Sequence, residues 1–532
     1  MNDIISTPVL GHNYIGGRRS ALGKAAQQSI GAETGLAYPV PFHQATPAEI
    51  DEAVLAASRA YREYRMLSVE KRADFLDQIA EEIDALGDDF IAEVSDETAL
   101  PTGRLQGEKL RTSNQMRLFA RVLRRGDFHG ARIDTALPQR QPMPRPDIRL
   151  CRIGMGPVAV FGASNFPLAF SVAGGDTAAA LAAGCPVVVK AHTGHMVTSE
   201  RVADAIERAR ERCGIPAGVF NMIYGTGVGA RLVQAPGIKA VGFTGSLKGG
   251  RALCDLAATR PDPIPVFAEM SSINPIVLLP GALKERGAAV ARDLAASVSM
   301  GCGQLCTSPG LVLGVQSPEL SVFAEQLAEA FGAMPAQTML NRGALDSYEA
   351  GLDRLKALDG AEVLAKGAAA GGKATAHVFK AKPGLLLDNP DAPLEEEVFG
   401  PSTVLVAFES QEQLTSFLTG MHGQLTATMI ATDAEVAGQS ALVSILEEKA
   451  GRLLLNGFPT GVEVCDAMVH GGPYPATSDP RGTSVGSLAI DRYLRPVCYQ
   501  NYPDALLPPV LQNANPLNVL RLVNGEFTRD AV

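Results

Sequence analysis

The sequence lacks several features that define other classes of protein. Its 57 acidic residues outnumber 47 basic ones, for a formal net charge of −10, and no block of basic residues stands out. A nucleic-acid-binding surface is therefore not expected. No apolar run is long enough to cross a membrane, and the first residues show no basic segment followed by an apolar one. These absences predict a cytoplasmic protein without nucleic-acid or membrane partners.

The eight cysteines lack any pairing pattern. There is no Cys-x-x-Cys pair, and Cys302 and Cys306 have no histidine or cysteine partners at zinc-site spacing. His192 and His195 form an i,i+3 pair without a supporting carboxylate. We therefore expect no metal site. Unpaired cysteines in a large chain are typical of a reducing cytoplasm.

Short apolar strands alternate with helical segments along most of the chain. The runs 158–162, 186–190, 219–224 and 240–243 are rich in β-branched and aromatic residues, and helical patterns separate them. This alternation predicts an α/β fold with a parallel, doubly wound sheet. A second alternation begins near Asn274 and runs to about residue 485. Ligands bind such sheets at the carboxyl ends of the strands.

The same alternation of strands and helices predicts where the domains begin and end. We expect a first domain from residues 1–131 and 156–273, and a second from residues 274–485, which carries Cys306. Residues 132–155 and 486–502 are not helix-periodic and are expected to form an extended arm. A C-terminal extension, 503–532, is rich in Pro, Asn and Leu and is expected to pack as irregular coil.

The segment Gly303-Gln304-Leu305-Cys306-Thr307 surrounds a cysteine with small and polar residues. Glu269 lies 37 residues upstream. A free thiol is only a few per cent ionised at neutral pH, so a nucleophilic cysteine needs a proton acceptor, which Glu269 could be. The alternative is an inert, buried cysteine, which is common.

Four other features lie near predicted strand ends. Asn165 follows a strand and could stabilise an oxyanion, or it could only form a turn. Lys190 ends a Val-rich strand and could hold a ribose or phosphate, or its ammonium could simply reach solvent. Gly245 and Ser246 open a helix, where backbone N–H groups favour a phosphate. In the acidic run 395–401, Glu397 could bind a ribose and Phe399 could stack on a nicotinamide, although a solvated charge run is the simpler alternative.

Taken in order, these motifs resemble the aldehyde dehydrogenase superfamily from about residue 45 to residue 500. The resemblance implies a Rossmann-like cofactor-binding domain, a catalytic domain and a small β arm that joins subunits into homodimers or homotetramers. It implies that Cys306 is the nucleophile, Glu269 the general base, and Asn165 with the Cys306 backbone N–H the oxyanion hole. The cofactor residues that it implies are Lys190, Gly245, Ser246, Glu397 and Phe399.

Departures from the common motifs point to one branch. Asn165 follows Ala-Ser instead of the frequent Pro-Trp, and the chain has no tryptophan. Ser271-Ser272-Ile273 replaces the usual Gly-Gly-Lys. These features and the run 461–478 resemble the 2-oxoglutarate semialdehyde (2,5-dioxovalerate) dehydrogenases, which implies oxidation of 2,5-dioxopentanoate to 2-oxoglutarate. Fatty aldehyde dehydrogenases of the same branch are one alternative, and a non-catalytic binding or structural protein is another.

Cofactor and substrate preferences rest on single positions. Thr193 stands where NAD-preferring relatives tend to carry a glutamate, so no carboxylate would repel a 2′-phosphate. This favours NADP, with NAD also possible. The substrate carboxylate needs a cation; Arg111 and Arg117 are candidates, and Arg111 is preferred. A thiol hydrolase would instead need a histidine such as His470 beside Cys306, but we expect His470 to be structural or adjacent to the substrate.

Overall fold

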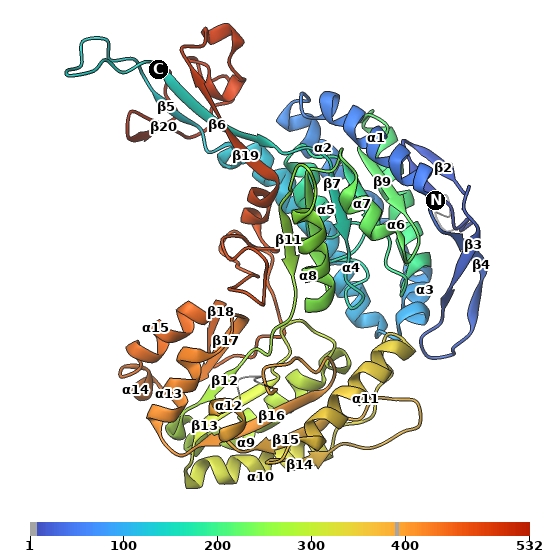
Figure 1. The fold of residues 1–532 in the computed structure, drawn as a ribbon, viewed down its shortest axis with the longest axis vertical. Helices are drawn as coiled ribbons and strands as arrows, with labels where there is room; N and C mark the ends of the chain where they lie inside the picture. The colour runs from blue at the N-terminus through green and yellow to red at the C-terminus, as the bar shows by residue number, and fades with distance from the viewer. Residues whose placement is uncertain (1–7, 389–392) are drawn as a thin grey trace.

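The computed structural model describes residues 8–388 and 393–532, which form two α/β domains and a projecting arm (Figure 1). The sheet of the first domain has the strand order β11-β10-β7-β8-β9-β1-β2. Its parallel strands are β7 (Val158–Phe161), β8 (Val187–Lys190), β9 (Phe220–Ile223), β10 (Ala240–Thr244) and β11 (Val266–Glu269). The antiparallel hairpin β1 (Asn13–Ile15) and β2 (Arg18–Ser20) extends the sheet beyond β9.

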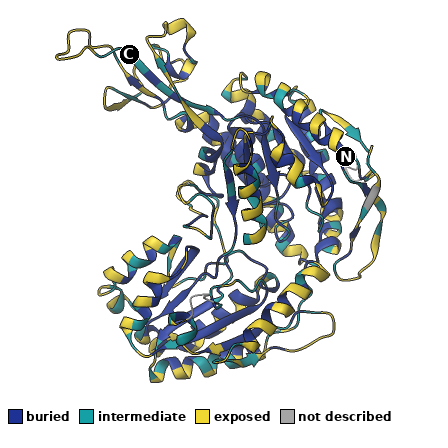
Figure 2. Cartoon of the chain, viewed as in Figure 1, coloured by how far each residue is buried: buried dark blue, intermediate teal, exposed yellow. Residues whose placement is uncertain are grey.

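Alternating side chains of the first sheet enter two separate cores. Val158, Val160 and Val187 pack with α2 (Val69–Asp84), α4 (Thr102–Arg125), α5 (Gly175–Ala182) and α6 (Met196–Arg212). Ala159 and Val188 point the other way, toward α1 (Pro47–Tyr64), α7 (Val228–Gln234) and α8 (Leu247–Ala258). Figure 2 shows the buried sheet between these exposed helical layers. The helix α3 (Asp88–Thr98) and the hairpin β3 (Ala25–Ile30) and β4 (Ala37–His43) complete the domain.

The second domain has the strand order β14-β15-β16-β13-β12-β17-β18. These strands are β12 (Ile276–Leu278), β13 (Leu311–Val315), β14 (Ala361–Lys366), β15 (His377–Ala381), β16 (Ser402–Phe408), β17 (Gln424–Ile430) and β18 (Ala450–Leu455). Helices α9 (Pro280–Ser299) and α10 (Pro318–Gly332) cover one face. Helices α11 (Arg342–Ala357), α12 (Gly384–Leu387), α13 (Gln411–Gly420) and α15 (Ser440–Lys449) cover the other, and α14 (Asp433–Val436) follows β17.

The arm is a five-stranded sheet in the order β19-β6-β5-β20-β21. Its strands are β5 (Arg132–Asp134), β6 (Ile148–Gly154), β19 (Leu494–Gln500), β20 (Arg521–Val523) and β21 (Glu526–Thr528). Before β19, η4 (Ser487–Tyr493) contacts α5 of the first domain. The short helices η2 (Asp127–His129), η5 (Asp504–Leu506) and η6 (Pro509–Leu511) lie beside these strands in the chain.

The expectation of irregular coil throughout 503–532 was wrong. Asn524 and Gly525 both have positive φ, at 50° and 94°, and they join β20 to β21 in a tight hairpin. Asn-Gly favours this type of two-residue turn, because both residues tolerate the left-handed region. The extension thereby adds two strands to the arm. In the described part of the chain, no helix is both long and apolar enough to span a membrane.

Candidate active site

The loop that carries Cys306 turns sharply after α9. The short helix η3 (Met300–Gly303) contains three consecutive residues with positive φ, the middle one being Cys302. A Cβ on Gly303 would lie 2.2 Å from the carbonyl carbon of Gly400, so only glycine permits this approach. The Asn274 side-chain amide then donates to the Cys306 carbonyl at 2.9 Å. Backbone geometry and this hydrogen bond fix the position of the thiol.

Glu269 ends β11 and lies beside Cys306, together with His470. The Sγ of Cys306 is 3.4 Å from Nε2 of His470, and the same nitrogen is 2.9 Å from Oε1 of Glu269. Ser484 Oγ donates to the other carboxylate oxygen at 2.8 Å. The side chains of His470 and Glu269 are only 1% and 3% exposed. The geometry therefore links thiol, imidazole and carboxylate in one chain of contacts.

The electrostatics of the three groups oppose a resting thiolate. Burial, together with the nearby carboxylate of Glu269, raises the pKa of Cys306 well above its usual value. Burial would also raise the pKa of Glu269, but His470 and the hydroxyl of Ser484 lower it on balance, so that it is a carboxylate. The thiol proton must therefore pass to a neighbour before the sulfur can attack. The Glu269 carboxylate, which also accepts a hydrogen bond from Nε2 of His470, is placed to receive it.

Asn165 approaches the same loop from the first domain. It is buried, and its side-chain amide donates to the carbonyl of Gln304 at 2.9 Å. The backbone carbonyl of Asn165 accepts a hydrogen bond from the Arg104 side chain at 2.6 Å. An amide has two N–H groups, so one remains for a developing oxyanion.

A cavity of about 480 Å³ lies between the two domains. Seven predicted site residues line it: Asn165, Gly245, Ser246, Glu269, Cys306, Glu397 and Phe399. At its edge α8 begins, with Ser246 Oγ accepting from the backbone of Gly249 at 3.2 Å. A Cβ on Gly245 would meet the Phe243 ring at 2.7 Å. The start of a helix, next to a glycine that has no side chain, suits a phosphate group, so the residues present fit a dinucleotide.

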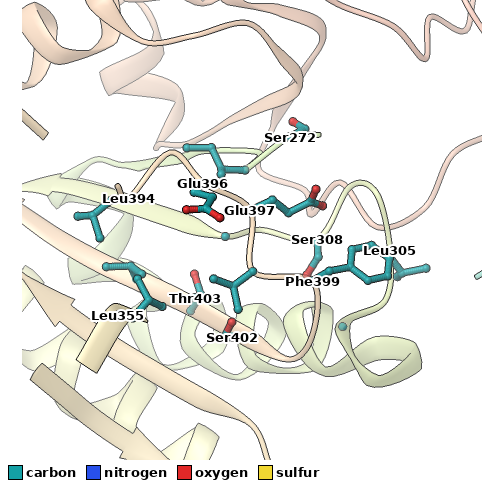
Figure 3. Close-up of a pocket in the computed structure, with 15 residues that line it drawn as sticks. Ser272, Leu305, Ser308, Leu355, Leu394, Glu396, Glu397, Phe399, Ser402 and Thr403 are labelled. Carbon is teal, nitrogen blue, oxygen red and sulfur yellow. The ribbon is translucent and has the colours of Figure 1, made fainter. Parts of the chain in front are cut away.

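Glu397 and Phe399 come from the loop before β16. Figure 3 shows them with Leu305 and Ser308, which line the same small pocket and lie within two residues of Cys306 in the chain. Burial, with the Glu269 carboxylate nearby, raises the pKa of Glu397 to about 8. In its neutral form the carboxyl group is able to donate a hydrogen bond as well as accept one.

Lys190 and Thr193 do not line this cavity. Lys190 ends β8 and is in register with Phe161, which ends β7. Lys190 therefore lies at the same edge of the sheet as the loop that carries Asn165. Burial lowers the pKa of its ammonium group to about 8. Thr193 is half-buried in the turn that follows. Arg231, on α7 after the neighbouring strand β9, forms a surface ion pair with Asp51.

The two arginine candidates on α4 have different surroundings. Arg117 forms an ion pair with Asp84 at 2.6 Å on the partly exposed side of the helix. Arg111 is half-buried and donates through Nη1 to the Val462 carbonyl at 2.5 Å. Its Nε and Nη2 are buried and have no hydrogen-bond partner among the described residues. Its guanidinium lies 5.5 Å from the centre of the Phe170 ring, which is itself 6.2 Å from the His470 ring. Arg111 is thus separated from His470 by the Phe170 ring and has two side-chain nitrogens whose N–H groups are not used in hydrogen bonds within the described part of the chain.

Comparison with known proteins identifies the family. Residues 38–473 match the Aldehyde dehydrogenase family. The chain belongs to this family. It is 53% identical over 523 residues to an alpha-ketoglutaric semialdehyde dehydrogenase of Acinetobacter baylyi, covering 98% of this chain and 99% of that protein. It is 51% identical over 498 residues to alpha-ketoglutaric semialdehyde dehydrogenase 2 of Azospirillum brasilense, covering 91% and 93%.

Solved aldehyde dehydrogenases share the fold at low identity. Lactaldehyde dehydrogenase from Escherichia coli aligns with a TM-score of 0.79 at 22% identity, covering 93% of this chain and 99% of that one. An NADP-dependent glyceraldehyde-3-phosphate dehydrogenase from Bacillus halodurans, solved with NADP, aligns with a TM-score of 0.78 at 18% identity, covering 93% and 99%. A variant of aldehyde dehydrogenase C from Pseudomonas syringae, solved with NAD+ and octanal, gives 0.77 at 20%, covering 93% and 98%. The predicted α/β aldehyde dehydrogenase fold is confirmed.

The sequence predicts that His470 is structural or adjacent to the substrate, and the structure places it in contact with both Cys306 and Glu269. It lies 164 residues after Cys306 and 201 after Glu269, and nothing in its local segment marks it as a base. The only local sign in the sequence is the pair of glycines that follows it, and its burial is visible only in the structure. The contact with the sulfur is the one that a thiol hydrolase would require.

Proposed function

We propose that this aldehyde dehydrogenase oxidises 2,5-dioxopentanoate, the semialdehyde of 2-oxoglutarate, to 2-oxoglutarate. The observation that carries the proposal is Arg111, a half-buried guanidinium near Cys306 with two unpartnered buried nitrogens. A substrate carboxylate would satisfy them in bidentate fashion. Two relatives that are more than half identical are named for the same semialdehyde, which supports this assignment.

In the proposed reaction, Cys306 Sγ adds to the aldehyde carbon while its proton moves to the Glu269 carboxylate, which His470 Nε2 holds by a hydrogen bond. The amide of Asn165 donates to the new oxyanion of the thiohemiacetal. A nicotinamide bound in the interdomain cavity would accept the hydride that leaves the thiohemiacetal, which gives a thioester on Cys306. Once Glu269 has released the thiol proton to solvent, its carboxylate takes a proton from water, and the resulting hydroxide attacks the thioester, releases the carboxylate product and frees Cys306.

We assign NADP as the preferred cofactor, with NAD as an alternative. Thr193 brings no negative charge to the turn after β8, and Lys190 brings a positive one at neutral pH. Arg231 is already paired with Asp51. Lys190 is therefore the cation proposed for the 2′-phosphate.

The protein is further proposed to be a homodimer or homotetramer. The arm projects away from both domains (Figure 1), and β18 is an edge strand of the second sheet. On β18, Leu453 and Leu455 are 37% and 51% exposed. Open strand edges with apolar side chains favour pairing with another chain. All eight cysteines are free thiols, which is consistent with a reducing cytoplasm as the proposed compartment.

The substrate proposal is tested by measuring the formation of reduced cofactor. We expect a higher kcat/KM for 2,5-dioxopentanoate than for a long-chain apolar aldehyde, and a higher kcat/KM for NADP than for NAD. A preference for the apolar aldehyde would instead assign the protein to the fatty aldehyde dehydrogenases. Hydrolysis of thioesters without cofactor, at a rate comparable to that of aldehyde oxidation, would support the alternative function of a thiol hydrolase.

The role of His470 is tested with His470→Gln, which removes the imidazole that donates to the Glu269 carboxylate. We expect kcat to fall by at least about tenfold, because the base Glu269 is no longer held beside the thiol. Alkylation of Cys306 by iodoacetamide should also slow, since the proton acceptor Glu269 is displaced. The control is His422→Gln, at an exposed histidine paired with Glu395. If His470→Gln retains both rates of the control, His470 is only structural.

A further inference from the structure

Three metal-binding side chains of different chemistry meet at one point of the active site. They are the sulfur of Cys306, Nε2 of His470 and a carboxylate oxygen of Glu269, all within 4.8 Å of one another. Around tetrahedral zinc, with bonds of about 2.0–2.3 Å, neighbouring ligand atoms lie roughly 3.3–3.6 Å apart. The observed spacings of 3.4 Å and 2.9 Å differ from this by a few tenths of an ångström. Small side-chain movements would therefore complete a zinc site.

We propose that this cluster is an inhibitory binding site for a thiophilic divalent cation such as Zn²⁺. One thiolate, one imidazole and one carboxylate form a mixed donor set that suits zinc or cadmium, whereas Mg²⁺ and Ca²⁺ require mainly oxygen ligands. On binding, a metal–sulfur bond replaces the S–H bond of Cys306, and the proton leaves to solvent. No electrons are transferred. A fourth position remains for water from the interdomain cavity.

The groups behind the ligands are already placed to support a metal. Ser484 Oγ donates to Oε2 of Glu269 at 2.8 Å, which leaves Oε1 directed at His470. The backbone of His470 is held in turn, with its N–H donating to Thr483 Oγ1 at 2.8 Å and its carbonyl accepting from the backbone N–H of Ser484 at 2.8 Å. Outer hydrogen bonds of this kind orient ligands and strengthen metal binding.

Binding at this point would block catalysis completely and reversibly. The metal would occupy the nucleophile Cys306 and the base Glu269 together. Both residues line the cavity of about 480 Å³, which gives the ion a route to the cluster. A cofactor or aldehyde in that cavity would compete with the metal. Among the described residues, no other group of three His, Cys, Asp or Glu side chains has this geometry. His192 and His195, for example, stack on each other instead.

The test measures how Zn²⁺ protects Cys306 from iodoacetamide, with mass spectrometry of the peptide that contains it. We expect saturable protection in the wild-type enzyme, reversed by a chelator, and none from Mg²⁺ at the same concentration. In His470→Gln, the zinc concentration for half-protection should rise at least about tenfold, because a ligand is lost. This concentration is independent of the slower alkylation of the variant. The control Cys498→Ser removes an exposed thiol outside the cluster and should leave the value unchanged.

A second measurement reports the bond itself. Titration with Co²⁺ should produce a thiolate-to-metal absorption band that is absent in Cys306→Ser and weakened in His470→Gln. Equal half-protection by zinc in the wild type and His470→Gln would overturn the proposal, as would equal protection by Mg²⁺. Neither readout uses turnover, so the result is independent of whether the protein oxidises 2,5-dioxopentanoate.

Discussion

At the scale of single residues, the surroundings of Cys306 keep the thiol protonated until it is needed. Burial and the Glu269 carboxylate raise its pKa. A protonated thiol reacts slowly with oxidants and alkylating agents, since the thiolate is the reactive form. Glu269, which accepts a hydrogen bond from His470 at 2.9 Å, is the proposed acceptor of the thiol proton when the aldehyde arrives. Activation is thereby linked to substrate binding.

Lys190 predicts how cofactor affinity depends on pH. Burial lowers the pKa of its ammonium group to about 8, so the charge is present below pH 8 and is lost as the pH rises. If it holds a 2′-phosphate, KM for NADP should begin to rise above about pH 8, by up to tenfold per pH unit. Lys190→Met should have a high KM for NADP at all pH values. An unchanged pH profile in that variant would exclude Lys190 from phosphate binding, and KM for NAD in the wild type serves as the control.

At the scale of elements, α4 presents two arginines to different surroundings and so provides its own control. Arg111→Ala should lower kcat/KM for 2,5-dioxopentanoate by about 10–150-fold, the worth of a charge-assisted hydrogen bond. For an uncharged aldehyde of similar length, the loss should be small. Arg117→Ala, which breaks only the ion pair with Asp84, should change neither value by more than about twofold. Equal losses on both aldehydes in Arg111→Ala would show that Arg111 supports the loop at Val462 and does not read the carboxylate.

The central strands could be predicted from the sequence, because a strand that is buried on both faces of its sheet is apolar at nearly every position. The strands β7 and β8 are apolar throughout except for Lys190, and they lie within the predicted runs. The short hairpins were missed, although each carries a turn signal. Gly16 and Gly17 join β1 to β2 with positive φ, as Asn524 and Gly525 join β20 to β21. Three-residue strands are too short for periodicity, so the turn was the only local sign.

The active site was predictable to the extent that its residues end strands or open helices. Parallel strands bring their carboxyl ends to one edge, so Glu269 and Lys190 lie on the same side of the first sheet. His470 is different, because it lies in an irregular segment that folds back from the second domain onto β11. An isolated bridge between Glu269 and Thr477 marks that return. Only the assembled fold shows such a contact.

At the scale of the whole molecule, the second sheet ends in the exposed strand β18. If subunits associate along this edge, Leu455→Lys should shift the protein toward a smaller species, because a charge would enter the interface. Light scattering coupled to size-exclusion chromatography measures the mass. Leu55→Lys is the matched control, at a leucine of similar exposure, 49%, on α1. The same mass for both variants would mean that the subunits meet elsewhere.

The central claim is that Cys306 carries the substrate as a thioester, and one measurement tests it directly. Glu269→Gln should form the thioester more slowly than the wild type and hydrolyse it more slowly still, because both steps lose their base. After incubation with NADP and 2,5-dioxopentanoate, mass spectrometry of the quenched variant should find the 2-oxoglutaryl group on the peptide that contains Cys306. The group should be absent without cofactor. An unmodified Cys306, or an adduct on another cysteine such as Cys302, would contradict the account.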